Sequence, residues 1–230
     1  MGVFIRKLLP LVLLPFLFHQ SRAQEAGSLI SNRVYQQAKP LFGGNFAIGY
    51  GILTEEMGQY FTYPFLLPIT GDFVYKRLVV QLNLEAGFSK VRQTMIFGDS
   101  TRWNKGDNAF HSALGFNLGV SIINTTDLRI TPVIGWANIL ISKKWWGSSD
   151  ISKHEPQTNY FNFALLTDLK KIYSSGRTYS SNKYDGYGAI RFTAGVYLPL
   201  EENKNYPGYY NGSFWYLSVG IAYMAAWDER

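Results

Sequence analysis

The chain has 230 residues, a formal net charge of +6 and no cysteine, which excludes a disulfide framework and a cysteine metal site. Half of that charge comes from Arg6, Lys7 and Arg22 near the N-terminus, and no basic cluster interleaved with aromatic residues follows them. The composition therefore gives no case for nucleic-acid binding.

Residues 1–23 have the layout of a secretory signal peptide. Arg6 and Lys7 precede an apolar run from Leu8 to Phe18, and Ala23 completes a small-x-small cleavage site. The run is about half the length of a membrane-spanning helix, so we expect removal rather than anchoring. No later segment reaches the roughly 18 apolar residues that such a helix needs. A membrane location would therefore require a barrel.

Residues 24–43 are polar with scattered apolar positions and are expected to form an N-terminal arm. The segment from Leu78 to Phe88 then shows a strict period of two, with apolar even positions and mostly polar or small odd ones. Alternate residues of a strand point to opposite faces. Eleven residues is also the length of a tilted strand that crosses a bilayer.

The same alternation recurs along the chain, and we expect strands at 45–52, 78–88, 110–122, 128–137, 161–170, 189–198 and 215–223. An eighth strand is expected from Tyr60 to Leu67, although Pro64 removes a ladder donor there. The prediction is a closed antiparallel transmembrane β-barrel of eight strands over residues 44–224, followed by a tail, 225–230. Ten strands remain open, with extra short ones near 54–76 and 170–185.

The charges within these strands all fall in one row. They are Glu85, Arg129, Asp168, Lys170 and Arg191, and each lies opposite the apolar row. A charge on the lipid face near the bilayer centre costs about 2–4 kcal/mol, so a charge-free row is what a membrane barrel requires. A soluble barrel would reverse the arrangement, with the aliphatic rows inside.

The mixed row is rich in Gly, Ala, Ser and Asn, which suit the crowded interior of a narrow barrel. We therefore expect a plugged polar interior. The expected interior network consists of Glu85, His111, Arg129, Asp168, Lys170 and Arg191. Buried charges must be paired, so the two carboxylates are expected to pair with the cations, and a gate along a narrow path is an open alternative.

Connection lengths predict the orientation. Outer-membrane barrels have short periplasmic turns and long external loops, which places the turn 124–127 in the periplasm. The segments 89–108 and 142–159 then face outside, with Trp103, Trp145 and Trp146 as loop or membrane-interface aromatics. The connection 174–187 is long for a periplasmic turn, and ten strands would relieve it.

The pattern as a whole resembles the OmpA/OmpX-type small outer-membrane β-barrels of Gram-negative bacteria. The last strand carries Ser218, Gly220 and Tyr223 in a spacing similar to the signal read by the barrel-insertion machinery. In that family the closing aromatic is normally the last residue, whereas here Met224 and the tail follow. The resemblance implies an outer-membrane location, contact with outer-membrane lipid and the insertion machinery, and no cofactor.

Little in the chain indicates catalysis or metal binding. His111 and Ser112 are adjacent in a strand, so they point to opposite faces and cannot form a nucleophile–base pair. His154 and Glu155 are a lone pair in an expected loop, too few for a metal site. We expect a non-enzymatic structural or surface-interaction protein with an unidentified extracellular or envelope partner. The alternatives are a narrow pore for small solutes, an outer-membrane lipid-modifying enzyme and a soluble periplasmic carrier of a lipophilic ligand.

Overall fold

The computed structural model describes residues 40–96, 102–125, 127–143, 157–171, 186–201 and 209–226. The chain divides into two units, Met1–Val34 and Tyr35–Arg230. The first unit lies outside the described residues, as do the expected signal peptide and nearly all of the expected arm, so those predictions stay predictions.

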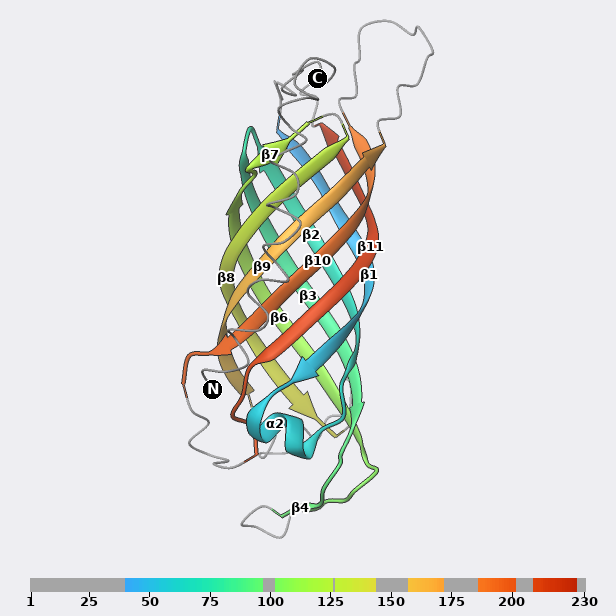
Figure 1. Cartoon of the computed structure of the whole chain (residues 1–230), viewed down its shortest axis with the longest axis vertical. Coiled ribbons are helices and arrows are strands. Elements are labelled where there is room, and N and C mark those ends of the chain that lie inside the picture. The colour runs from blue at the N-terminus through green and yellow to red at the C-terminus, as the bar shows by residue number, and fades with distance from the viewer. Residues whose placement is uncertain are drawn as a thin grey trace, which may run out of the picture. The chain divides into compact units, whose positions relative to one another are not determined.

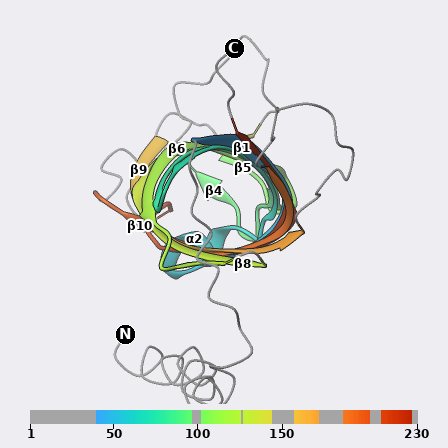
Figure 2. The ribbon, with the colours of Figure 1, turned by 90° about the horizontal axis from the view of Figure 1, so that it is seen from above.

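Eight long antiparallel strands form a closed barrel (Figures 1 and 2). They are β1 (Leu41–Leu53), β2 (Phe65–Tyr75), β3 (Leu78–Lys90), β6 (Asn108–Val120), β8 (Leu128–Ser142), β9 (Gln157–Lys171), β10 (Tyr187–Pro199) and β11 (Phe214–Ala226). Each strand pairs with the next one along the chain, and β1 pairs with β11 from Leu41↔Ala226 to Leu53↔Phe214, which closes the cylinder. The prediction of an eight-stranded antiparallel barrel is confirmed, and the ten-stranded alternative is wrong.

Four short elements accompany the eight long strands. They are α2 (Glu55–Tyr60), β4 (Met95–Ile96), β5 (Arg102–Trp103) and β7 (Ile123–Asn124), of which β7 pairs with the start of β8. The helix α2 and the β4–β5 pair belong to the end of the barrel that carries the long connections (Figure 1). Within the described ranges, no helix is long and apolar enough to cross a membrane.

The two-residue alternation of β3 corresponds to two faces of the wall. Leu78, Leu82 and Leu84 are exposed on the outside, whereas Gln81 and Glu85 are buried inside. The other seven strands follow the same rule. The outward rows are therefore mostly large and apolar, whereas the charged side chains of the wall point in together with small, polar and some apolar ones, as the charge-free row predicts for a membrane barrel.

The expected strand from Tyr60 to Leu67 is wrong in its position. Tyr60 ends α2, Phe61 forms an isolated bridge with Val91 and is fully buried, and the strand itself is Phe65–Tyr75. The reason is local: Pro64 cannot donate to a ladder, so pairing in β2 begins just after it. Phe65 is exposed on the outer face as expected, but Phe61 is not.

The barrel segment is also slightly longer than expected. It begins at Leu41 and ends at Ala226, compared with the expected 44–224, because Leu41↔Ala226 is still a ladder pair. The strands β8 and β9 extend to Ser142 and Gln157, several residues beyond the expected 128–137 and 161–170. These extensions carry polar side chains that period-two reasoning did not assign.

The two ends of the barrel differ in their connections. One end holds the two-residue turn between β2 and β3, the β6–β8 connection, and the beginning and end of the barrel segment; we call it the terminal end. The other end holds the connections 54–64 and 91–107 and the strand ends that flank 143–156 and 200–213; we call it the loop end (Figure 1). The β2–β3 and β6–β8 connections match the expected short turns, whereas the β9–β10 connection at the same end spans 15 residues and remains longer than that expectation.

Candidate functional site: the outer wall and the filled lumen

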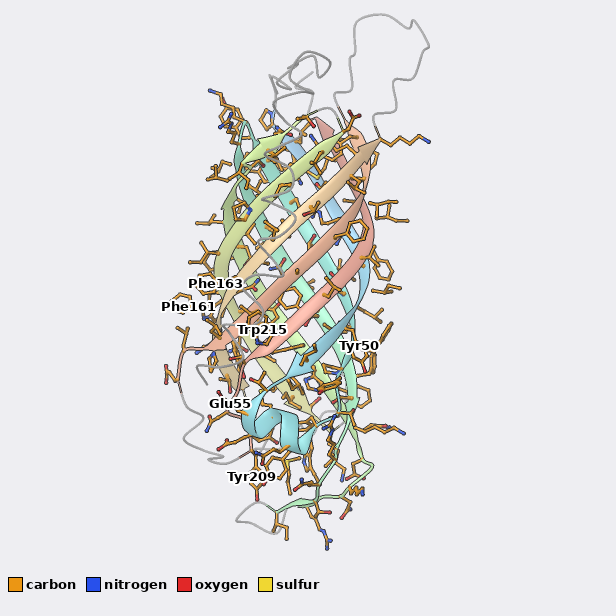
Figure 3. All side chains as sticks on the ribbon, in the orientation of Figure 1. Tyr50, Glu55, Phe161, Phe163, Tyr209 and Trp215 are labelled. Atoms are coloured by element: carbon orange, nitrogen blue, oxygen red, sulfur yellow. The ribbon has the colours of Figure 1, made fainter. Side chains whose placement is uncertain are left out.

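The outer wall is a belt of large apolar side chains. The described part of the chain leaves 31 large hydrophobic residues exposed, among them Leu82 at 62%, Leu217 at 61% and Ile221 at 76%. A soluble monomer rarely exposes contiguous apolar surface beyond a few hundred Å². Figure 3 shows Tyr50, Phe161, Phe163 and Trp215 in a band between the centre of the barrel and the loop end. Such aromatic bands mark the interfaces of membrane barrels.

Inside the wall, near the terminal end, four charged side chains form one ionic cluster. Asp168 Oδ2 accepts from Arg129 Nη2 at 2.7 Å, and Asp168 Oδ1 accepts from Arg191 Nε at 2.6 Å. Arg191 Nη1 also pairs with Asp72 Oδ2. All four are at most 4% exposed. Two formal positive and two formal negative charges balance, which is how a buried charge becomes tolerable.

Neutral side chains extend this cluster across the lumen. Gln81 Nε2 donates to Asp72 Oδ1 at 2.9 Å, and Asn117 Nδ2 donates to Gln81 Oε1 at 3.0 Å. Asn162 Nδ2 then donates to Asn117 Oδ1 at 3.0 Å, and the Tyr216 hydroxyl donates to Asn162 Oδ1 at 2.9 Å. The chain of contacts, which we call the lumen network, joins seven of the eight barrel strands.

A close backbone approach makes room for this network. A Cβ atom added at Gly135 would lie 2.0 Å from the Phe116 carbonyl oxygen and 2.2 Å from Asn117 Oδ1. The clash with the Phe116 carbonyl involves backbone, so movement of a flexible side chain would not relieve it. Glycine at this position therefore lets β8 approach Asn117 closely enough for the network to form.

Two expected members of the interior network lie apart from the ionic cluster. Lys170 is half-buried and donates to Asn124 Oδ1 at 2.6 Å and to the Thr125 carbonyl at 2.9 Å. Glu85 is buried, and among the described residues it forms no ion pair. The expectation that both carboxylates pair with a cation is therefore right for Asp168 and wrong for Glu85.

His111 lies inside the wall and Ser112 outside, on opposite faces of β6. Within the lumen, His111 Nε2 and Ser89 Oγ are 2.6 Å apart. The ring packs against Phe61 and Phe214, and in the described structure its Nδ1 atom has no hydrogen-bond partner. Without an orienting acid, and enclosed by aromatic rings, the Ser89–His111 pair lacks the geometry of an activated nucleophile.

The loop end of the lumen is filled by an apolar cluster. Met57 of α2 and Phe61, Met95, Tyr210 and Phe214 are each at most 2% exposed. We call α2 with residues 209–213 the lid. Its two parts are joined by backbone bonds from Thr54 N to Ser213 O at 3.0 Å and from Met57 N to Asn211 O at 3.1 Å.

The structure places the expected loop aromatics differently. Trp103 was expected in an external loop or at the interface, but it is 2% exposed and packs edge-on against Phe61 in the lid cluster. Trp103 thus lies in the expected loop, between β3 and β6, but it is buried at the loop end of the lumen rather than at the membrane interface. Trp145 and Trp146 lie outside the described residues.

The expected insertion signal lies on β11. Ser218 and Gly220 point inward, and Tyr223 is 64% exposed on the outer wall. A Cβ atom at Gly220 would meet the Phe46 carbonyl oxygen at 2.3 Å, so this glycine is also needed for the pairing of β11 with β1. A role in insertion remains a prediction.

Sequence reasoning missed Asp72, Gln81 and Asn117 as network members, together with the lid. Asp72 lies in a segment for which no strand is expected, so the alternation does not predict whether its side chain points into the lumen or outward. The signal was available, since the turn Lys76-Arg77 before the well-defined β3 predicts a hairpin whose first strand includes Asp72. The described residues contain no group of three or more His, Cys, Asp or Glu side chains that could hold a metal ion.

Comparison with known proteins finds similar folds but no close relative. No protein-family model matches the sequence, and no curated protein matches it significantly. Among solved structures, Ail, the attachment invasion locus protein of Yersinia pestis, in complex with the heparin analogue sucrose octasulfate, has 7% identity and a TM-score of 0.43, covering 81% of this chain and 99% of its own.

Two further structures are similar at the same level. The N-terminal β-barrel domain of Pseudomonas aeruginosa OprF has 9% identity and a TM-score of 0.39, covering 81% of this chain and 97% of its own. Neisserial surface protein A has 10% identity and a TM-score of 0.43, and the match covers 80% of this chain and 95% of its own. These neighbours are small outer-membrane barrels of eight strands. With TM-scores below 0.5 these likenesses carry no argument, and the strand pairing establishes the barrel fold by itself.

Proposed function

We propose that the mature protein is an integral outer-membrane barrel with a structural or surface-interaction role carried by its loop end. The observation that supports this most strongly is the inversion of the wall: large apolar side chains outside, and Asp72, Arg129, Asp168 and Arg191 buried inside. A soluble carrier of a lipophilic ligand would need the aliphatic rows inside. The alternation of the strands argues against that alternative.

The filled lumen supports a non-conducting and non-catalytic barrel. The lumen network crosses the interior from β8 to β11, and the lid cluster fills the loop end. A narrow interior of eight strands is just wide enough for its own side chains. A pore would require these groups to move together.

Two measurements test the proposal. Outer-membrane fractionation with heat-modifiable migration on denaturing gels is expected to identify a membrane barrel. Recovery in a urea-soluble periplasmic fraction without the gel shift would overturn it. In planar bilayers the wild type is expected to conduct no more than a bilayer without protein. A reproducible conductance that changes in Glu85→Gln would favour the gated pore instead.

The surface role depends on which end faces outward, and the absence of native cysteine makes this easy to test. Lys105, at the loop end, and Lys76, at the terminal end, are both exposed. In intact cells, a membrane-impermeant maleimide is expected to label Lys105→Cys and to leave Lys76→Cys unlabelled. Labelling of Lys76→Cys alone would reverse the orientation and contradict the proposed role of the loop end.

A further inference from the structure

A cluster of three amide side chains interrupts the apolar outer wall. Asn138 of β8 and Asn159 and Gln157 of β9 all belong to outward rows of the barrel. Asn138 Nδ2 donates to Asn159 Oδ1 at 2.9 Å, and Gln157 Nε2 donates to Asn138 Oδ1 at 2.6 Å. We call these three residues the amide cluster.

The amide cluster lies at a defined depth in the wall. Trp136 pairs with Phe161, and Asn138 pairs with Asn159 two positions closer to the loop end. Two residues along a strand span about 7 Å. Phe161 belongs to the aromatic band in Figure 3, so the amides follow directly beyond that band on the loop side.

Strand length supports an interfacial position. β8 and β9 have 15 residues each, which is about 50 Å along the strand and roughly 38 Å along the barrel axis at a tilt near 40°. The apolar band of such barrels is about 25 Å tall. The ends of these two strands therefore extend beyond the hydrocarbon layer, where headgroups of the bilayer meet the wall.

The chemistry of the amide cluster fits a neutral, hydroxyl-rich ligand. An amide offers two N–H donors and one carbonyl acceptor. Among the described residues, the side-chain oxygen Oε1 of Gln157 and the side-chain nitrogen Nδ2 of Asn159 have no protein hydrogen-bond partner. The outward rows from Ile130 to Ser142 and from Gln157 to Thr167 carry no charge. Recognition by hydrogen bonds alone suits sugar hydroxyls better than a phosphate, which favours Arg or Lys.

We propose that the amide cluster binds the sugar headgroup of a glycolipid in the membrane leaflet at the loop end. This inference rests on the proposed membrane location. The lipid's acyl chains would lie along Phe116, Ile134 and Phe163 on the outer wall, and its sugar hydroxyls would exchange hydrogen bonds with Asn159 and Gln157. Apolar neighbours on both sides hold the lipid in place without a pocket.

Native mass spectrometry of the full barrel, released from phosphatidylethanolamine nanodiscs, tests this. One set of nanodiscs contains a deep-rough lipopolysaccharide, with both sugar and phosphate, and another a monogalactosyl diacylglycerol, with sugar alone. The wild type is expected to retain both glycolipids in preference to phosphatidylethanolamine. In the triple variant Asn138→Leu, Gln157→Leu, Asn159→Leu, retention of both is expected to fall by at least about fivefold, equivalent to roughly one net hydrogen bond.

Asn108→Leu is the matched control, because Asn108 is an exposed, outward-facing amide at the loop end of β6, outside the cluster. It is expected to retain both glycolipids like the wild type. Equal retention by the triple variant overturns the inference, as does retention of lipopolysaccharide without the galactolipid, which would indicate phosphate recognition. A dimeric wild type with a monomeric triple variant would assign the cluster to a second copy of the chain. Heat-modifiable migration of each sample separates these outcomes from failure of the barrel to insert.

Discussion

The two halves of the lumen differ in that only the terminal half holds the ionic cluster, beside the buried apolar residues Leu41, Val79 and Met224. Near the terminal end, Asp168 and Asp72 form ion pairs with Arg129 and Arg191. Hydrogen bonds extend from these residues across the barrel. Near the loop end, Met57, Phe61 and Phe214 fill the space with apolar contacts. A buried network fails when one partner is lost, because the other is left unpaired. An apolar cluster loses contacts in proportion to the volume removed and can partly relax.

The largest effect is expected at the centre of the ionic cluster. Asp168→Asn leaves Arg129 without its carboxylate and Arg191 with one of two, and breaking a buried ion pair in this way costs about 3–5 kcal/mol. Urea unfolding from phospholipid vesicles is the measurement, with Asp107→Asn as the control for loss of a surface carboxylate. A loss below about 1 kcal/mol would show that the ionic cluster is not the rigid half of the lumen.

The lid is expected to respond less. Met57→Ala removes a fully buried side chain whose Sδ atom lies 3.5 Å from the Tyr160 hydroxyl. We expect the free energy of unfolding to fall by about 2–3 kcal/mol, which is at the lower end for such truncations because the lid can partly relax into the space. The conservative Met57→Leu should cost less than about 1.5 kcal/mol in the same unfolding assay. A cost for Met57→Ala above that of Asp168→Asn would invert the comparison between the two halves.

Removal of one neutral hydroxyl is expected to have a smaller effect on the free energy of unfolding. Tyr216→Phe removes the donor to Asn162 Oδ1 and keeps the ring stacked on Tyr197, whose centroid is 4.9 Å away. The expected loss is about 1 kcal/mol in urea unfolding. Tyr209→Phe, which removes an exposed hydroxyl at the lid, is the control and should cost less. Equal effects would indicate that the lumen network ends before Tyr216.

The smallest effect is expected at the surface pair beside the barrel mouth. Lys143 Nζ lies 2.7 Å from Asp107 Oδ2, and its hydrogen bond, with a second from the Asn104 N–H, holds the pKa of Asp107 below its usual value. A lowered pKa in the folded state stabilises above the usual value near 4 and loses that contribution as the pH falls through the lowered one. Lys143→Met should raise the pKa, measured by carboxyl NMR titration, and cost less than about 1 kcal/mol. An unchanged pKa would remove Lys143 as the cause.

The wall of the barrel could be predicted from the sequence because its two faces differ at every second residue. Leu82 and Glu85 differ in side by parity alone, and one slip in register would exchange them. The same alternation predicts that the side chains of Arg129 and Arg191 point into the lumen. It could not choose the partners, since they depend on the strand register, which places Asp168 directly opposite Arg129 and Arg191, and on Asp72, which reaches Arg191 from a strand that is not its neighbour.

The lid and the amide cluster were beyond such reasoning for another reason. Trp103 and Phe61 are aromatic residues near a barrel mouth, and sequence alone does not distinguish a membrane-interface position from a folded-in one. Asn138 and Gln157 lie past the last clear apolar alternation of β8 and β9, so the strands were expected to end before them. Their outward direction follows only from the ladder, which continues through Asn138↔Asn159 to Leu140↔Gln157.

The most direct test of the inverted wall is a spin-label scan of β3 in lipid vesicles, with single cysteines placed one by one from Leu78 to Phe88. Collision rates with oxygen and with a water-soluble nickel complex are measured at each position. The account predicts a period of two, with high oxygen and low nickel accessibility at Leu82 and Leu84 and low accessibility to both at Gln81 and Glu85. High nickel accessibility at Leu82 and Leu84 would mean that this row faces water, and the membrane barrel would be contradicted.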